Sequence, residues 1–79
     1  MPVVFRSGGF KFFFYSNEGD PREPVHIHVR GADGVAKFWV NPVGLDPSDG
    51  YDARVLRELE SLVKNRAALI ERTWHEYFG

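Results

Sequence analysis

Two histidines one residue apart, His26-Ile27-His28, are the strongest chemical signal in the chain. In an extended strand, alternate side chains point to the same face, so both imidazoles would reach one metal ion or one phosphate group. Imidazole also titrates near neutral pH, which suits proton transfer. The spacing is therefore typical of two metal ligands, of a general acid and base acting on an RNA 2′-hydroxyl, or of partly exposed strand residues without chemistry.

A metal site would need more ligands than this histidine pair supplies. A catalytic zinc site takes three protein ligands and a structural one takes four. The third histidine, His75, is followed by Glu76 near the end of the chain, and there is no cysteine. We expect this C-terminal segment to lie in the layer opposite the histidine pair. The sequence therefore predicts neither a metal site nor a cofactor.

The catalytic hypothesis assigns roles to four further residues. Arg30 and Lys37 would hold the phosphate of the RNA, while His75 and Glu76 would complete the site with the histidine pair. Neighbouring residues of a helix point about 100° apart, so His75 and Glu76 cannot easily share one target. This hypothesis predicts a metal-free ribonuclease-like activity.

Alternation along three expected strands separates an apolar face from a cationic and aromatic face. The apolar rows should pack against a helix. The other face combines rings with Lys, Arg and His, as in surfaces that stack bases and neutralise phosphates of single-stranded RNA. The apolar rows are Phe10, Phe12 and Phe14, then Val25, Ile27 and Val29, then Ala36, Phe38 and Val40; the opposite rows are Lys11, Phe13 and Tyr15, then His26, His28 and Arg30, then Lys37 and Trp39.

The predicted binding residues on this second face are Lys11, Tyr15, Arg30, Lys37 and Trp39. Aromatic side chains are unfavourable to leave in water, so we expect them to meet a cognate small protein, RNA or a second copy of the chain. The plainer alternative is that these rings are cross-strand neighbours that support the sheet.

The distribution of residue types predicts an α+β fold. Aromatic and β-branched residues fill short segments early in the chain, whereas helix formers dominate the end. Residues 41–50 hold two prolines and two aspartates and are expected to form a connector with at most a short edge strand. We expect a meander of three to four antiparallel strands, over 3–6, 10–16, 25–30 and 35–40, with hairpin turns at 7–9 and 31–34 and a loop over 17–25 that leaves room for another strand order.

From Asp52 onward, apolar residues recur at spacings of three and four, which predicts an amphipathic helix. Asp52 is the expected N-cap, and Glu60 and Lys64 should pair across one turn. Residues 65–66 interrupt the apolar stripe, but neither is Gly or Pro, so we expect one long helix to Phe78. The stripe consists of Leu56, Leu59, Leu62, Val63, Leu69, Ile70, Trp74 and Tyr77.

Length and composition restrict the class of protein. The 79 residues are sufficient for one domain over 1–79, and 43% hydrophobic residues exclude a disordered chain. The net charge of -1 gives no overall argument for nucleic acid or a membrane surface. No apolar run approaches the roughly 18 residues of a membrane span, and there is no secretory signal, so we expect a cytoplasmic protein. Phosphate-binding loops, dinucleotide fingerprints, zinc-protease helices and nucleophile elbows are absent.

Several segments have a familiar order and spacing: 10–18, 23–30 with its His-Ile-His-Val strand, 36–42 with Ala-Lys-Phe-Trp, 56–59, and the Trp-His-Glu-Tyr-Phe ending. Over essentially its whole length the chain resembles the bacterial DUF4160 family, a domain of unknown function. The resemblance implies a small protein encoded beside a second short protein, in an arrangement like a toxin–antitoxin pair. It places the polar signature of the family on His26, His28, Lys37, Trp74, His75 and Glu76.

Two functional hypotheses follow. The preferred one is a binding module of a toxin–antitoxin-like pair, which binds a cognate small protein or RNA through the cationic and aromatic sheet face. The alternative is a ribonuclease-like toxin with His26 and His28 as acid and base. A metal-dependent version of that activity is the less favoured form.

Overall fold

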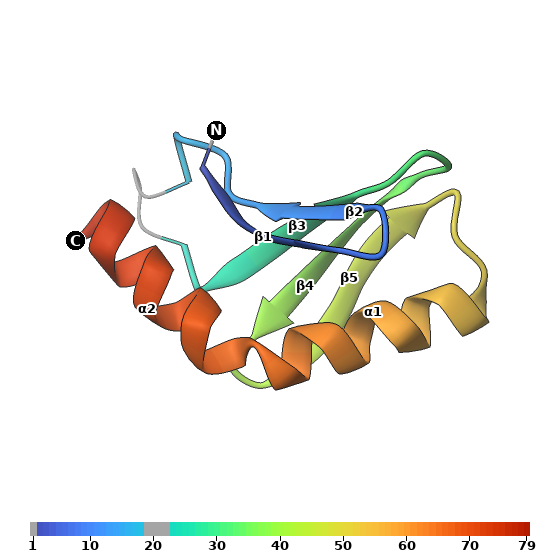
Figure 1. The fold of residues 1–79 in the computed structure, drawn as a ribbon. Coiled ribbons are helices and arrows are strands. Elements are labelled where there is room, and N and C mark those ends of the chain that lie inside the picture. The colour runs from blue at the N-terminus through green and yellow to red at the C-terminus, as the bar shows by residue number, and fades with distance from the viewer. Residues whose placement is uncertain (1, 19–22) are drawn as a thin grey trace.

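The protein forms a five-stranded antiparallel sheet with two helices on one of its faces (Figure 1). The computed structural model describes residues 2–18 and 23–79. The strands follow the chain in the order β1-β2-β3-β4-β5, which confirms the meander. No helix in the described ranges is long and apolar enough to cross a membrane. The elements are β1 (Val3–Ser7), β2 (Phe10–Phe13), β3 (His26–Arg30), β4 (Val35–Val40), β5 (Val43–Asp49), α1 (Ala53–Asn65) and α2 (Ala67–Phe78).

The two predicted hairpin turns are both present. Gly8 and Gly9 have φ angles of 56° and 83°, a region that side chains with a Cβ disfavour, and they place Ser7 opposite Phe10. At the second turn the Gly31 amide donates to the Gly34 carbonyl at 3.2 Å. Both turns therefore determine the register of the strands that they join.

The sheet has five strands, whereas the sequence analysis predicted three to four. Residues 41–50 contain the seven-residue strand β5, which pairs with β4 along one edge of the sheet. An edge strand leaves one side without a partner, so a proline in it need not remove a ladder hydrogen bond. The pairing also shifts register between Val35 and Lys37, which accommodates the irregular backbone. The prolines and aspartates of this segment were therefore misleading.

The predicted single helix is divided in two at Arg66, whose φ and ψ of -111° and 12° leave the helical region. A continuous helix over 53–78 would be about 39 Å long, and the longest dimension of the molecule is 34 Å. Breaking the helix keeps both halves against the sheet. The Arg66 guanidinium lies 5.1 Å from the centre of the Phe5 ring on β1.

The apolar face is the one predicted from alternation. Its rows pack against the buried helix residues Leu59, Val63, Ile70 and Trp74. Tyr77 differs from its prediction, since 48% of it is exposed. After the break at Arg66 the row that packs on the core runs at intervals of four through the buried Ile70 and Trp74 to the partly buried Phe78, so Tyr77 points away. The Glu60–Lys64 pair is confirmed, at 3.9 Å.

The start of α1 gives a direct test of local stability. Asp52 accepts a hydrogen bond from the Val55 amide at 3.0 Å, as an N-cap should. We expect Asp52→Ala to lower the free energy of unfolding by about 1 kcal/mol in urea denaturation, and Asp52→Asn to lose little of it. Equal losses in both variants would contradict the capping role.

Candidate functional site

The face of the sheet that the helices leave uncovered, here called the open face, carries the predicted polar rows. Strand pairing aligns Phe13, His28, Lys37 and Asp46 across β2 to β5. It also places His26 opposite Trp39. Directly paired residues of antiparallel strands point to the same face, so these side chains share one surface.

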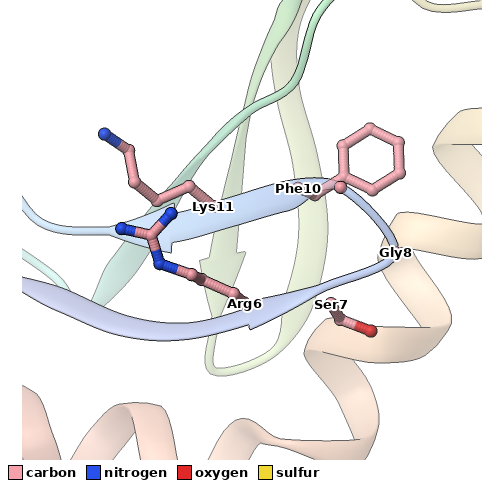
Figure 2. Close-up of a pocket in the computed structure, with 6 residues that line it drawn as sticks. Arg6, Ser7, Gly8, Phe10 and Lys11 are labelled. Atoms are coloured by element: carbon pink, nitrogen blue, oxygen red, sulfur yellow. The ribbon is translucent and has the colours of Figure 1, made fainter.

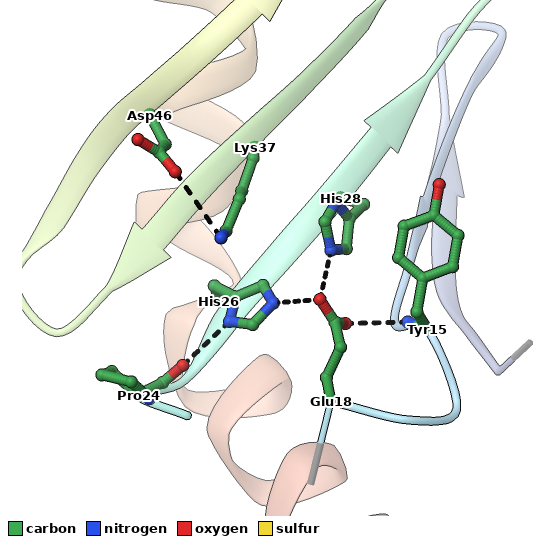
Figure 3. Close-up of polar contacts among 7 residues, drawn as sticks. All are labelled: Tyr15, Glu18, Pro24, His26, His28, Lys37 and Asp46. Atoms are coloured by element: carbon green, nitrogen blue, oxygen red, sulfur yellow. Dashed lines mark hydrogen bonds and ion pairs between the residues drawn. The ribbon is translucent and has the colours of Figure 1, made fainter. Parts of the chain in front are cut away.

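Glu18, which the sequence analysis did not select, joins the two histidines (Figure 3). Its Oε2 atom contacts Nε2 of both imidazoles, at 2.6 Å in the case of His28. Its Oε1 atom accepts a hydrogen bond from the Tyr15 amide at 2.8 Å. The Nδ1 atom of His26 lies 2.9 Å from the carbonyl oxygen of Pro24. We call Glu18, His26 and His28 the histidine–glutamate cluster.

A turn at the end of β2 positions Glu18. The predicted strand over 10–16 ends at Phe13, and the Glu18 amide donates to the Tyr15 carbonyl at 3.3 Å. This turn brings Glu18 over the ends of β2 and β3, where the histidines point (Figure 3). Residues 19–22 of the predicted loop over 17–25 lie outside the described residues. The earlier end of the strand is therefore what brings a carboxylate into the cluster.

The cluster is largely buried. His26 has no exposed surface, because its ring contacts both Trp39 and Trp74, with ring centres 5.4 and 5.1 Å away. The side chains of Glu18 and His28 are 10% and 17% exposed. In this conformation His28 is the histidine of the pair that a ligand on the open face can touch.

Burial and hydrogen bonding set the charges of the cluster. Burial raises the pKa of Glu18, but its polar contacts with both histidines and the hydrogen bond from the Tyr15 amide outweigh it and hold the pKa below the ordinary 4.5. For His28, burial lowers the pKa below the ordinary 6.5, against the opposing effect of Glu18. At neutral pH the cluster therefore contains a carboxylate and a neutral His28.

A row of three cations crosses the open face beside the cluster. Arg6 pairs with Lys11, and Lys11 pairs with Arg30, so the three residues stand side by side on β1, β2 and β3. Figure 2 shows Arg6 and Lys11 extending in the same direction beside the first hairpin. Both line a pocket of about 340 Å³. Lys11 and Arg30 also lie over the buried Phe13 ring, at 5.3 and 5.6 Å from its centre.

Lys37 and Trp39 lie on the other side of the cluster. The Lys37 ammonium is 4.3 Å from the centre of the Trp39 ring and 3.5 Å from the Asp46 carboxylate. Trp39 is half-buried and lines an apolar pocket of about 360 Å³ together with Pro24 and Pro42. The cation of Lys37 is therefore already shared between a ring and a carboxylate.

The structure brings together most of the predicted site residues. Lys11, Tyr15, Arg30, Lys37 and Trp39 all lie on the strands or turn that surround the histidine pair. His75 and Glu76 are exposed on α2 and do not belong to the cluster. The helix layer covers the apolar face, so these two residues are separated from the open face as the sequence analysis anticipated.

Sequence reasoning missed Glu18 and Arg6 for different reasons. Arg6 could have been found, because a two-residue turn at Gly8-Gly9 places it opposite Lys11 by counting. Glu18 precedes the histidines by eight and ten residues and stands in a loop with other acids, so no spacing distinguishes it. Its role depends on how the turn folds back.

The cluster is also a set of potential metal ligands. One donor atom each from Glu18, His26 and His28 lies within 4.8 Å of the others. Among the described residues, these three form a group that could hold a metal ion. Two imidazoles and one carboxylate are a donor set that transition metals accept. The reason for expecting no metal, the lack of a third ligand near the histidine pair, therefore does not hold.

Comparison with known proteins finds one family. The family model described as "Domain of unknown function (DUF4160)" matches residues 9–75 and so spans most of the chain, which confirms the resemblance. No curated protein and no solved structure matches significantly.

The shifted pKa values predict how stability depends on pH. Because folding lowers the pKa of His28, its contribution to the free energy of unfolding is complete above about pH 6.5 and is lost as the pH falls below that value. Folding also lowers the pKa of Glu18, so a second loss of stability begins as the pH falls below about 4.5. We expect the free energy of unfolding, measured with EDTA present, to decline in these two ranges.

Variants identify the source of each decline. His28→Gln should remove the loss that begins near pH 6.5, whereas the exposed His75→Gln on α2 should retain it. An unchanged pH profile in His28→Gln would rule out this assignment.

Proposed function

The chain belongs to the DUF4160 family, whose description leaves the activity open, and we propose that it is a binding module that takes RNA on the open face of its sheet. Within the toxin–antitoxin-like arrangement that the family resemblance implies, an acidic surface of a cognate small protein is the competing partner. The positive charges on β1 to β3 support an anionic partner, and the accessible rings of Tyr15 and Trp39 favour RNA as that partner.

The observation that carries this proposal is the row of Arg6, Lys11 and Arg30. Like charges directly opposite each other destabilise a sheet, and this row sets three cations on neighbouring strands, across about 10 Å. Among the side chains that the structure describes, no carboxylate forms an ion pair with any of the three. A bound polyanion would relieve that repulsion, and phosphates are well suited to arginine.

Rings at the edge of the same face favour RNA over a protein surface. Tyr15 is 38% exposed, and Trp39 lines the apolar pocket beside Pro24 and Pro42. A pocket of about 360 Å³ with an aromatic wall is suitable for an unstacked base. Phe13 does not contribute in this way, since it is buried beneath Lys11 and Arg30.

A symmetric dimer through the open face is less well supported. Such a dimer would bring the cation row of one copy toward that of the other, and like charges across an interface are unfavourable. A homodimer through another surface stays a prediction.

The ribonuclease-like alternative also stays a prediction, with weaker support from the geometry. A two-histidine mechanism needs both imidazoles at the substrate, whereas His26 is fully buried and His28 shares the same Glu18 oxygen. His28 with Lys37 and Arg30 would be the accessible part of such a site.

An NMR titration with short mixed-sequence single-stranded RNA tests the proposal. We expect salt-sensitive shifts at Lys11, Arg30 and Trp39, with the RNA intact. Lys11→Gln and Arg30→Gln should each weaken binding about fivefold at low salt and reduce the slope of log K against log salt by about 0.7.

The matched control is Arg72→Gln, which removes an exposed cation from α2 on the other layer and should bind as the original chain does. A poly-glutamate peptide is the second probe, because it presents carboxylates without bases. Binding of both probes with equal affinity would contradict the preference for RNA, and saturable binding of neither would contradict the module itself. New RNA cleavage products would favour the ribonuclease alternative.

A further inference from the structure

We propose that Glu18, His26 and His28 bind one divalent transition-metal ion of the zinc class, through Oε2 of the carboxylate and Nε2 of each imidazole. This site is separate from the cation row and does not depend on RNA binding. Three features carry it: the hydrogen bond between His26 and Pro24, the convergence of the donor atoms, and the chemistry of the donor set.

The hydrogen bond to Pro24 determines where the proton of His26 lies. A carbonyl oxygen only accepts, so Nδ1 of His26 must donate to it across 2.9 Å. In neutral imidazole this leaves Nε2 with a bare lone pair, and that atom faces Oε2 of Glu18. Two acceptors then point at each other, an arrangement that a cation between them would convert from repulsive to attractive.

The hydrogen bond from His26 to Pro24 is of the kind that orients histidines bound to metal ions. A ligating imidazole commonly donates its other ring N–H to a carbonyl or carboxylate, which fixes the tautomer and the ring orientation. Glu18 has a comparable support, because the Tyr15 amide donates to the oxygen that does not face the histidines. Two of the three donors are therefore held in place by backbone groups.

The donor atoms converge closely enough to share one ion. All three lie within 4.8 Å of one another, and a tetrahedral ion with bonds of roughly 2.0–2.1 Å needs donors about 3.4 Å apart. The Glu18 oxygen is nearer than that to His28 Nε2, at 2.6 Å. A small rotation about the side-chain bonds of Glu18, the cluster's one loop residue, would open the space for the ion.

The donor set selects the type of ion. Imidazole nitrogen suits zinc, copper, nickel and iron, whereas magnesium and calcium prefer oxygen ligands alone. Two neutral imidazoles and one carboxylate would leave a divalent ion with a net positive charge. Three protein ligands also leave at least one coordination position open to water, as in catalytic zinc sites.

The metal-free explanation of the same geometry is a doubly protonated His26 paired with the Glu18 carboxylate. That pair would bury a charged imidazolium, because His26 has no exposed surface, and removing charges from water is costly. A pair that keeps its proton in the presence of Zn²⁺ would give no saturable metal binding, whereas a metal site releases that proton on binding, so a binding measurement separates the two explanations.

The first experiment titrates the untagged, EDTA-treated and dialysed chain with Zn²⁺ by calorimetry and with Co²⁺ by visible absorption. We expect one Zn²⁺ per chain with a dissociation constant of about 1 μM or tighter, and Co²⁺ bands typical of four or five ligands. Long-range ¹H–¹⁵N spectra should show Zn²⁺ shifting Nε2 of His26 while Nδ1 keeps its proton.

Variants then assign the ligands. Glu18→Gln and His28→Gln should each weaken Zn²⁺ binding by about 100-fold or more, and both are preferred to a His26 variant because that buried ring also supports packing. His75→Gln, which removes an exposed histidine from α2, is the matched control and should bind normally. The original chain must gain thermal stability on adding Zn²⁺.

Two results would overturn the proposal. Absence of saturable Zn²⁺ and Co²⁺ binding to the original chain would leave the imidazolium–carboxylate pair as the explanation. Undiminished affinity in both Glu18→Gln and His28→Gln would place the bound ion elsewhere.

Discussion

Side-chain alternation in the central strands is the constraint on which the rest of this structure depends. Because β2, β3 and β4 alternate in phase, every apolar row points to the face that α1 and α2 cover. The rows that carry the histidines, cations and Trp39 are thereby left together on the open face. A one-residue slip in any of these strands would exchange the two sets, so packing of the core also aligns the site.

His26 is the informative exception to that division. It lies on the polar row and yet has no exposed surface, because Trp39, Trp74 and Glu18 enclose it at the end of the sheet. Trp74 comes from α2, so the helix that closes the core also contacts the cluster. The ring of His26 therefore packs directly against a side chain of α2.

The cation row and the histidine–glutamate cluster are neighbours on one surface. His28 and Arg30 are two residues apart on β3, which is about 7 Å along a strand. An anion held by Arg30 and Lys11 would lie next to the open coordination position of an ion at His28. The two proposals rest on different atoms of one surface.

The sequence by itself determined what is local or periodic: the α+β class, the two faces of β2 to β4, both hairpins and the Asp52 cap, because alternation and turn chemistry are properties of neighbouring residues. Only the tertiary structure decided the rest. The helix breaks at Arg66, so that both halves pack on one sheet, and the segment after Asn41 becomes β5 because the edge of β4 offers it hydrogen bonds. Glu18 contacts the histidines because a turn folds back over the sheet. His26 and Glu18 are eight residues apart, and no periodic pattern in the sequence indicates such a contact.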